Sequence, residues 1–130
     1  MNVFPVKAKQ AGGQLRLDLY DGLYLEYAAD SFAPDVRSTL LARADMMLGV
    51  RPYAVHRSSD GAAAQVIANQ WLGDQSHIAA SFAGGTLVLV EHDRADLAVG
   101  DTIKVRLMPD DLHFFDTDTG AAISHGGQLA

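Results

Sequence analysis

LAVGDTIKVRLMPDDLHFFDTDTG, residues 97–120, is the stretch that decides the fold of this chain. A polar turn at Gly100-Asp101 leads into residues 102–108, where apolar and polar side chains alternate with the period of two expected of a half-buried strand. A Pro-Asp-Asp corner, a short apolar run and an aspartate-rich turn follow. No array of nucleophile, base and metal ligands stands in this stretch, so it indicates a module more than an active site.

The residues upstream of this stretch read as further short strands. Residues 62–72, which follow a polar break at 57–61, fit a strand or a helix by periodicity, and their branched and aromatic side chains favour the strand. Residues 76–82 and 86–90 form the next predicted pair. A tight turn at the Gly-Gly pair 84–85 joins them, since both glycines can take a positive φ.

The amino-terminal part begins as a meander. Residues 3–9 are a predicted strand, and two alternating runs at 15–19 and 23–27 flank Asp21-Gly22, a two-residue hairpin signal. Residues 30–45 break this pattern and predict a short helix, with a loop as the alternative. Residues 46–50 are a compact apolar run, for which we expect a buried strand.

Eight or nine short strands separated by regular turns predict an all-β fold of short antiparallel strands, with at most one or two short helices. We expect a single domain over 1–130, in which a first β-meander over 1–55 precedes a closed, five-stranded OB-like barrel over 62–120. The sequence has no Pro/Gly-rich linker long enough to separate two independent domains.

The composition is that of a folded chain with an acidic balance. Hydrophobic residues make up 48% of the sequence and charged residues 20%, and the net charge is −6, which opposes non-specific binding to nucleic acid or anionic lipid. Cysteine is absent, so the sequence offers no thiolate ligand or Cys nucleophile and fits a reducing compartment. It shows neither a secretory signal nor an apolar run approaching the roughly 20 residues of a membrane-spanning helix.

Several short pieces stand in a fixed order along the chain: MNVFP at 1–5, LGVRP at 48–52, LG at 72–73, Gly100-Asp101 with the strand after it, and LHFFD at 112–116 followed by Thr119-Gly120. Together they resemble the carboxy-terminal regulatory region of ATP-binding subunits of carbohydrate-importing ABC transporters. This is the maltose-importer class, whose chains end in the OB-like module called TOBE. In that family an acidic residue usually follows the Arg-Pro pair, where this chain has Tyr53-Ala54-Val55.

The resemblance implies a regulatory and dimerisation domain that is not catalytic by itself. Its implied partners are a second copy of itself, the nucleotide-binding domain of a sugar or sugar-phosphate importer, the transmembrane permease subunits and regulatory proteins, in the cytoplasm and peripheral to the inner membrane. The sequence lacks a GxxxxGK[ST] phosphate loop. The chain therefore looks like the tail of a longer protein whose ATP and Mg belong to a nucleotide-binding domain outside this sequence, and we expect no cofactor, metal or catalytic residue here.

The family motifs supply the candidate interface residues of this chain. Strict alternation of side chains along a strand would turn one ring of the Phe pair inward and leave the other for a partner. The candidates are Arg51, Pro52, Gly100, Asp101, His113, Phe114, Phe115, Asp116 and Gly120.

Four other interpretations of the sequence compete with this one. Asp118-Thr119-Gly120 matches the aspartic-protease triplet, but a hairpin turn is favoured because only ten residues follow it. The aspartates at 110–118 with His113 could supply hard-metal ligands, although a solvated acidic turn is favoured over an EF-hand-like site. The glycine pairs at 12–13 and 126–127 resemble a nucleotide-contacting motif but are typical of turns.

The aromatic residues allow the fourth interpretation, a platform on which bases stack. The acidic charge favours core packing or a protein interface instead. The aromatic residues concerned are Trp71, Phe82, Phe114 and Phe115.

An alternative function is a small-ligand, oxyanion-type binding β-module. Such sites gather backbone N–H groups with Ser, Thr or Lys side chains near turns. The candidates for this function are Ser76, Thr86 and Lys104.

Overall fold

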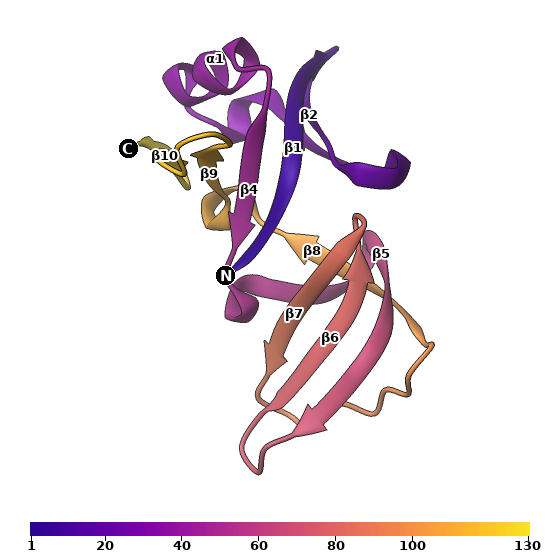
Figure 1. Ribbon diagram of the computed structural model, residues 1–130. Coiled ribbons are helices and arrows are strands. Elements are labelled where there is room, and N and C mark those ends of the chain that lie inside the picture. The colour runs from indigo at the N-terminus through magenta and orange to yellow at the C-terminus, as the bar shows by residue number, and fades with distance from the viewer. The chain divides into compact units, whose positions relative to one another are not determined.

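Antiparallel strands make up most of the molecule, with one α-helix among them (Figure 1). The computed structural model describes residues 1–130, except for the side chain of Asp21. The chain divides into two units that interleave along the sequence. Unit 1 holds residues 1–2 and 50–107, and unit 2 holds residues 3–49 and 108–130. The predicted all-β class is confirmed.

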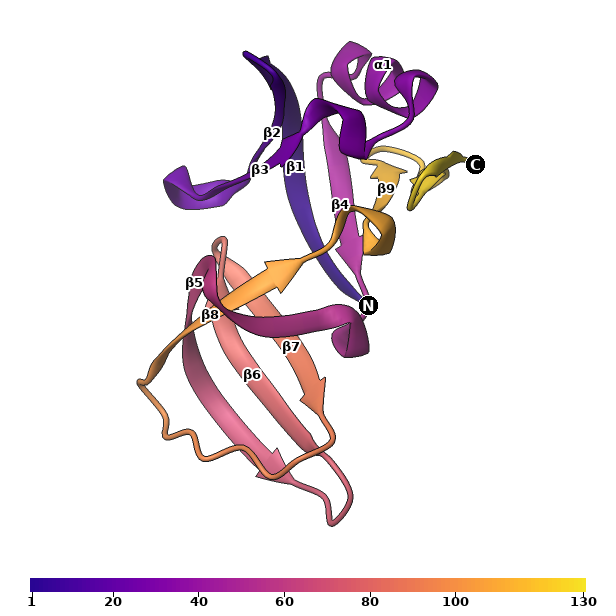
Figure 2. The same cartoon turned by 180° about the vertical axis from the view of Figure 1, so that it is seen from behind.

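Unit 1 is built on a four-stranded sheet in the order β7-β6-β5-β8. The long strand β5 pairs with β8 over its first part and with β6 over its second (Figure 2). The elements are the 3-10 helix η3 (Pro52–Ala54) and the strands β5 (Val55–Trp71), β6 (Ser76–Phe82), β7 (Gly85–Glu91) and β8 (Thr102–Leu107).

The polar segment 57–61, predicted as a break between strands, lies inside β5. Arg57 and Ala62 both face Val105 of β8, so the residues between them form a bulge. A bulge adds residues to one strand without ending the pairing, which is why β5 continues where a turn was expected.

The hairpin between β6 and β7 turns one residue earlier than predicted. Phe82 pairs with Gly85, and Ala83 and Gly84 are the two loop residues, with φ of 52° and 75°. Positive φ at both central positions is the geometry whose twist matches the flanking strands. Ala83 therefore takes the left-handed conformation expected of a glycine, and Gly85 begins β7.

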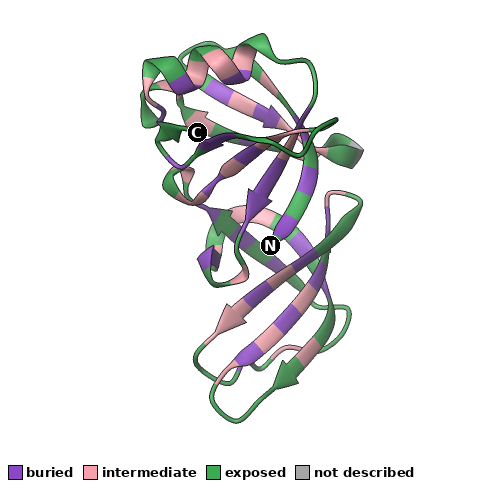
Figure 3. Ribbon diagram, turned by 60° about the vertical axis from the view of Figure 1, so that its left-hand side comes forward, coloured by how far each residue is buried: buried purple, intermediate pink, exposed green. Residues whose placement is uncertain are grey.

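The core of unit 1 follows the period of two (Figure 3). Along β6 the buried residues Ser76, Ile78, Ala80 and Phe82 alternate with half-buried or exposed ones. Buried Leu87 and Leu89 extend this face onto β7. Removal of these apolar side chains from water is the main force that holds the sheet's inner face in place.

Unit 2 contains a seven-stranded sheet in the order β11-β10-β9-β4-β1-β2-β3. The strands are β1 (Asn2–Ala11), β2 (Gln14–Asp18), β3 (Tyr24–Ala28), β4 (Met46–Val50), β9 (His113–Asp116), β10 (Ala122–His125) and β11 (Gln128–Leu129). The helices are η1 (Tyr20–Gly22), η2 (Ala29–Ser31), α1 (Pro34–Ala42) and η4 (Pro109–Asp111).

The predicted division into a meander over 1–55 and a closed barrel over 62–120 is wrong. Strand β9 falls within the range predicted for the barrel, but it pairs with β4, with Leu48 opposite Phe114. Both side chains are fully buried. Pairing these two apolar strands from distant parts of the sequence removes their side chains from water, which favours the interleaved units.

Two local expectations have different outcomes. The helix predicted within 30–45 is confirmed as α1, which has Pro34 in its first turn and buries Val36 and Leu40. The two-residue hairpin predicted at Asp21-Gly22 is instead the one-turn helix η1, and the Asp21 side chain lies outside the described residues.

None of the helices in the described chain combines the length and apolar character needed to cross a bilayer.

Ser124 is the one buried side chain in the described part of the molecule whose polar atom has no hydrogen-bond partner. Ser124→Ala should raise the free energy of unfolding by about 1 kcal/mol, because an unpaired buried hydroxyl carries a desolvation cost. Urea denaturation followed by circular dichroism measures this change, with exposed Ser59→Ala as the control. A lower stability for Ser124→Ala would show that the hydroxyl is paired after all.

Candidate functional site

The β9–β10 hairpin of unit 2 carries the last and most specific of the family motifs. Phe114 points into the core and is fully buried, whereas Phe115 is partly exposed. The alternation along β9 thus turns one ring inward and the other outward, as expected from the sequence. His113 and Asp116 flank the pair, and Gly120, with φ of 73°, lies in the turn that leads to β10.

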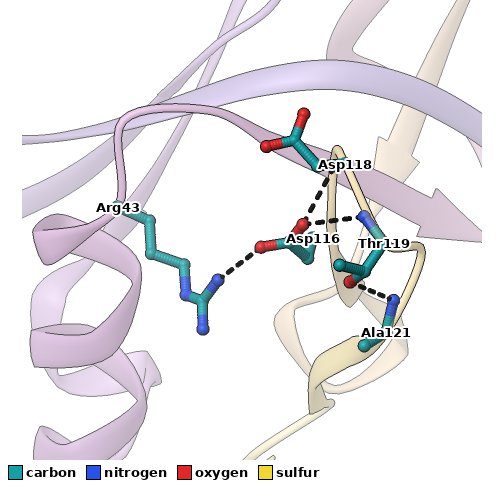
Figure 4. A network of polar contacts seen from close by, with 5 residues as sticks. All are labelled: Arg43, Asp116, Asp118, Thr119 and Ala121. Carbon is teal, nitrogen blue, oxygen red and sulfur yellow. Dashed lines mark hydrogen bonds and ion pairs between the residues drawn. The ribbon is translucent and has the colours of Figure 1, made fainter.

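Asp116 organises this turn (Figure 4). Its Oδ1 accepts hydrogen bonds from the backbone N–H groups of Asp118, at 2.9 Å, and Thr119, at 3.0 Å. Its Oδ2 lies 2.9 Å from Nη1 of Arg43, the residue after α1. The Ala121 N–H donates to Thr119 Oγ1 at 3.1 Å. One carboxylate therefore ties the turn to itself and to the end of the helix.

These contacts lower the pKa of Asp116. The backbone N–H groups of Thr119 and Asp118 are the main causes, and the charge of Arg43 adds to them. A carboxylate with a lowered pKa stabilises the fold at any pH above its ordinary value of about 4, and this stabilisation is lost as the pH falls through the lowered pKa.

Asp116→Asn should therefore make the stability of the fold depend less on pH in the acidic range. Above pH 4 the variant should be less stable than the parent, because a neutral Asn accepts weaker hydrogen bonds from the Thr119 and Asp118 N–H groups and has no charge to pair with Arg43. Below pH 4 the difference should shrink, as the parent Asp116 becomes protonated. Thermal melts from pH 2 to 7 measure this, and a difference that stays constant across that range would contradict the assignment.

His113 and His125 face each other across β9 and β10. They are directly paired in register, and their Nδ1 atoms are 2.8 Å apart. The Phe115 and His125 rings make an edge-on contact, with centroids 6.1 Å apart. His125 was not among the predicted site residues, because no spacing in the sequence indicates this register.

The predicted residues Gly100 and Asp101 lie in unit 1, where their backbone groups form hydrogen bonds with Val66 of β5. The Gly100 N–H donates to the Val66 carbonyl, and the Val66 N–H donates to the Asp101 carbonyl, both at 2.8 Å. The Asp101 Oδ2 accepts from the Ala98 N–H at 2.9 Å. Gly100 has φ of 95°, which a side chain would strain. These contacts give both residues a structural role.

Arg51 and Pro52 also lie in unit 1, at the start of η3. The Arg51 carbonyl accepts a 2.9 Å hydrogen bond from the Ala54 N–H, which closes the turn into β5. Tyr53, the first residue after the Arg-Pro pair, is 67% exposed.

Unit 1 also contains an open pocket of about 490 Å³. The Asn69 side-chain amide donates to the carbonyls of Ala95, at 2.9 Å, and Leu97, at 3.1 Å, and so holds the loop that forms one wall. The pocket is lined by Asn69, Trp71, Arg94, Ala95, Asp96 and Leu97. It combines one cation, one carboxylate and an indole, which suits a small polar ligand better than an apolar one.

The residues predicted for oxyanion binding are not brought together. Ser76 is fully buried, and its Oγ accepts a hydrogen bond from the Ala95 N–H at 2.9 Å. Thr86 lies on β7 and Lys104 on β8, which are the outer strands of the four-stranded sheet. Arg94, beside the pocket, was not predicted because a single arginine in a loop carries no pattern.

Asp118-Thr119-Gly120 is the hairpin turn that was favoured, and the two glycine pairs lie at the turns between β1 and β2 and between β10 and β11. Phe82 and Phe114 are buried and so cannot stack with bases. No group of three or more His, Cys, Asp or Glu side chains able to hold a metal ion occurs among the described residues.

Comparison with known proteins gives three findings. A family model described as TOBE domain matches residues 48–115. The Uncharacterized ABC transporter ATP-binding protein y4oS of Sinorhizobium fredii (strain NBRC 101917 / NGR234) is 27% identical over 124 residues, which are 95% of this chain and 31% of that protein. This chain thus spans about a third of its relative's length.

The third finding is a likeness of fold. The cytoplasmic molybdate-binding protein ModG, in a crystal form with molybdate bound, aligns with a TM-score of 0.58 and 15% sequence identity. The alignment covers 87% of this chain and 94% of the other.

Proposed function

Because this chain belongs to the TOBE domain family, we propose that it is the regulatory domain of an ABC importer ATP-binding subunit and does no chemistry by itself. The observation that carries the proposal is the family match over 48–115, joined to 27% identity with an ABC transporter ATP-binding protein over nearly the whole chain. The absence of a phosphate-loop motif from the sequence supports the non-catalytic part.

The proposed transporter imports sugars or sugar phosphates, as the resemblance of the sequence motifs implies. The domain would hold two ATP-binding subunits together at the cytoplasmic side of the membrane while their nucleotide-binding domains open and close. A regulator that binds one of these arrangements more tightly changes the ATPase cycle by that difference in affinity alone. The exposed face of the β9–β10 hairpin, with Phe115 and His113, is the proposed contact surface.

Sedimentation equilibrium of the purified chain tests the dimerisation role. The chain should self-associate as its concentration is raised, and Phe115→Ala should shift the equilibrium toward monomer. Tyr53→Ala, which removes an exposed aromatic ring from unit 1, is the matched control and should leave the equilibrium unchanged. A chain that stays monomeric at millimolar concentration, or a Phe115→Ala variant that associates as the parent does, would contradict this role.

A second candidate function is oxyanion binding in the pocket of unit 1. The exposed Arg94 supplies a cation there, and the fold likeness to a molybdate-binding protein makes this class of ligand worth testing. Calorimetric titration with molybdate, tungstate, phosphate and sugars tests the candidate. Binding heat that is measured for an oxyanion with the parent chain and is lost in Arg94→Ala would support this candidate. The absence of binding heat with every ligand would contradict it and leave only the regulatory function.

A further inference from the structure

The His113–His125 contact joins two strands whose register places the two rings side by side. The residues are direct cross-strand partners of β9 and β10, and their Nδ1 atoms are 2.8 Å apart. His125 is exposed and His113 half-buried, so solvent reaches the pair. The ring centroids are 5.0 Å apart at an interplanar angle of 61°.

Two neutral imidazoles at this distance share one proton. One Nδ1 must donate and the other must accept, since two lone pairs or two N–H groups would repel each other at such a separation. A metal ion can take the place of that proton when the donating ring carries its proton on Nε2 instead, because each neutral ring then has an Nδ1 lone pair for the same cation. Neutral imidazole is the commonest protein ligand of transition metals.

The distance between the two nitrogens is that of a hydrogen bond, and it also fits one metal geometry better than another. Metal–imidazole bonds are about 2.0–2.1 Å long, so two ligands in adjacent positions of a square-planar ion are roughly 2.9 Å apart, whereas two ligands of a tetrahedral ion are roughly 3.4 Å apart. The observed 2.8 Å is near the first value. Square-planar and tetragonal nitrogen sites are typical of Cu(II) and Ni(II), and tetrahedral ones of zinc.

We propose that His113 and His125 form a two-imidazole binding site for Cu(II) or Ni(II), with water in the remaining coordination positions. Affinity should fall in the order Cu(II), Ni(II), Zn(II). The general order of divalent-metal affinities places Cu(II) above the other two ions. The distance between the nitrogens favours Ni(II) over Zn(II), because it fits square-planar better than tetrahedral geometry. The bound ion would join β9 to β10 across the hairpin that carries Phe115 and Asp116.

The surroundings hold the two rings in place. The Gly126 N–H donates to the Leu112 carbonyl at 2.8 Å, which fixes the backbone directly after His125 against the residue before His113. The Phe115 ring lies beside the His125 ring at an interplanar angle of 73°. A pair positioned before the metal arrives loses less side-chain entropy on binding than two independent surface histidines would.

The chain offers matched controls in its other histidines. His92 is exposed in unit 1, and no contact of its ring with another histidine is found among the described residues. His77 contacts the Gln75 side-chain amide through Nε2, at 2.8 Å. His92 is therefore the control, because it is a single surface histidine that should bind metal only weakly.

Titration of the metal-free chain with CuCl₂, NiCl₂ and ZnCl₂, each alone and in a non-chelating buffer, tests the site. The parent chain should bind one Cu(II) per chain, and His113→Ala and His125→Ala should each weaken this binding at least tenfold, whereas His92→Ala should not change it. Electron paramagnetic resonance of the Cu(II) complex should show coupling to two imidazole nitrogens in the parent and to one in either single variant.

Folding is checked separately, so that a loss of binding can be interpreted. Circular dichroism should show parent-like spectra for His125→Ala, whose side chain is exposed, and His113→Gln replaces His113→Ala if that variant unfolds. Saturating Cu(II) should raise the melting temperature of the parent and not that of His125→Ala. Parent-like Cu(II) affinity in a folded His125→Ala variant, or tighter binding of Zn(II) than of Ni(II) by the parent, would overturn the proposal.

Discussion

Phe114→Ala is expected to lower the free energy of unfolding by about 3–5 kcal/mol. The Phe114 side chain is fully buried in unit 2 and lies opposite Leu48, which is buried as completely. Truncation to alanine removes its apolar surface from the core and leaves a cavity that the surrounding strands can fill only in part. Urea denaturation followed by far-ultraviolet circular dichroism measures the effect.

Phe115→Ala is the matched control for this prediction. The Phe115 ring is partly exposed on the other face of β9, so its removal should cost less than about 1.5 kcal/mol, a small part of the Phe114 effect. Equal losses for the two variants would show that β9 does not turn one ring inward and the other outward.

Gly61→Ala should destabilise unit 1 by roughly 3 kcal/mol. A Cβ atom at this position would overlap the Val105 carbonyl oxygen and lie 2.5 Å from its carbonyl carbon. Both belong to the backbone of β8, so the clash can be relieved only if β5 and β8 separate at the bulge. Urea denaturation followed by the fluorescence of Trp71, in unit 1, measures the loss.

Gly13→Ala is the control for the glycine substitution. A Cβ atom at Gly13 meets nothing within 4 Å, and its φ is not in the left-handed region. The alanine variant should therefore keep its stability to within about 0.5 kcal/mol. If Gly61→Ala is as stable as Gly13→Ala, β5 and β8 do not approach each other through the bulge as described.

Local patterns predicted most of the strands, because alternation and turn residues act over a few positions. Strand β4 and strand β6 have the bounds expected for them, and α1 begins at the predicted Pro34. The pairing of β4 with β9 was missed, since nothing in the two sequences specifies which apolar strand each one meets. The bulge in β5 was missed for a related reason: polar residues in a bulge look like those of a turn.

The candidate site was predicted in part. The motif at 112–116 correctly indicated that one ring of the Phe pair faces outward, and the favoured turn at Asp118-Thr119-Gly120 is present. The contact of Asp116 with Arg43 joins residues far apart in the sequence, as does the pairing of His113 with His125. Such contacts depend on tertiary register, which local periodicity does not determine.

Steady-state ATP hydrolysis by the purified chain, measured with Mg over a range of ATP concentrations, tests most directly whether it regulates rather than catalyses. The proposed function predicts a rate equal to that of buffer alone at every ATP concentration, because the sequence contains no phosphate loop to hold the nucleotide. Hydrolysis that requires Mg and saturates with ATP would contradict the proposal that this TOBE domain does no chemistry by itself.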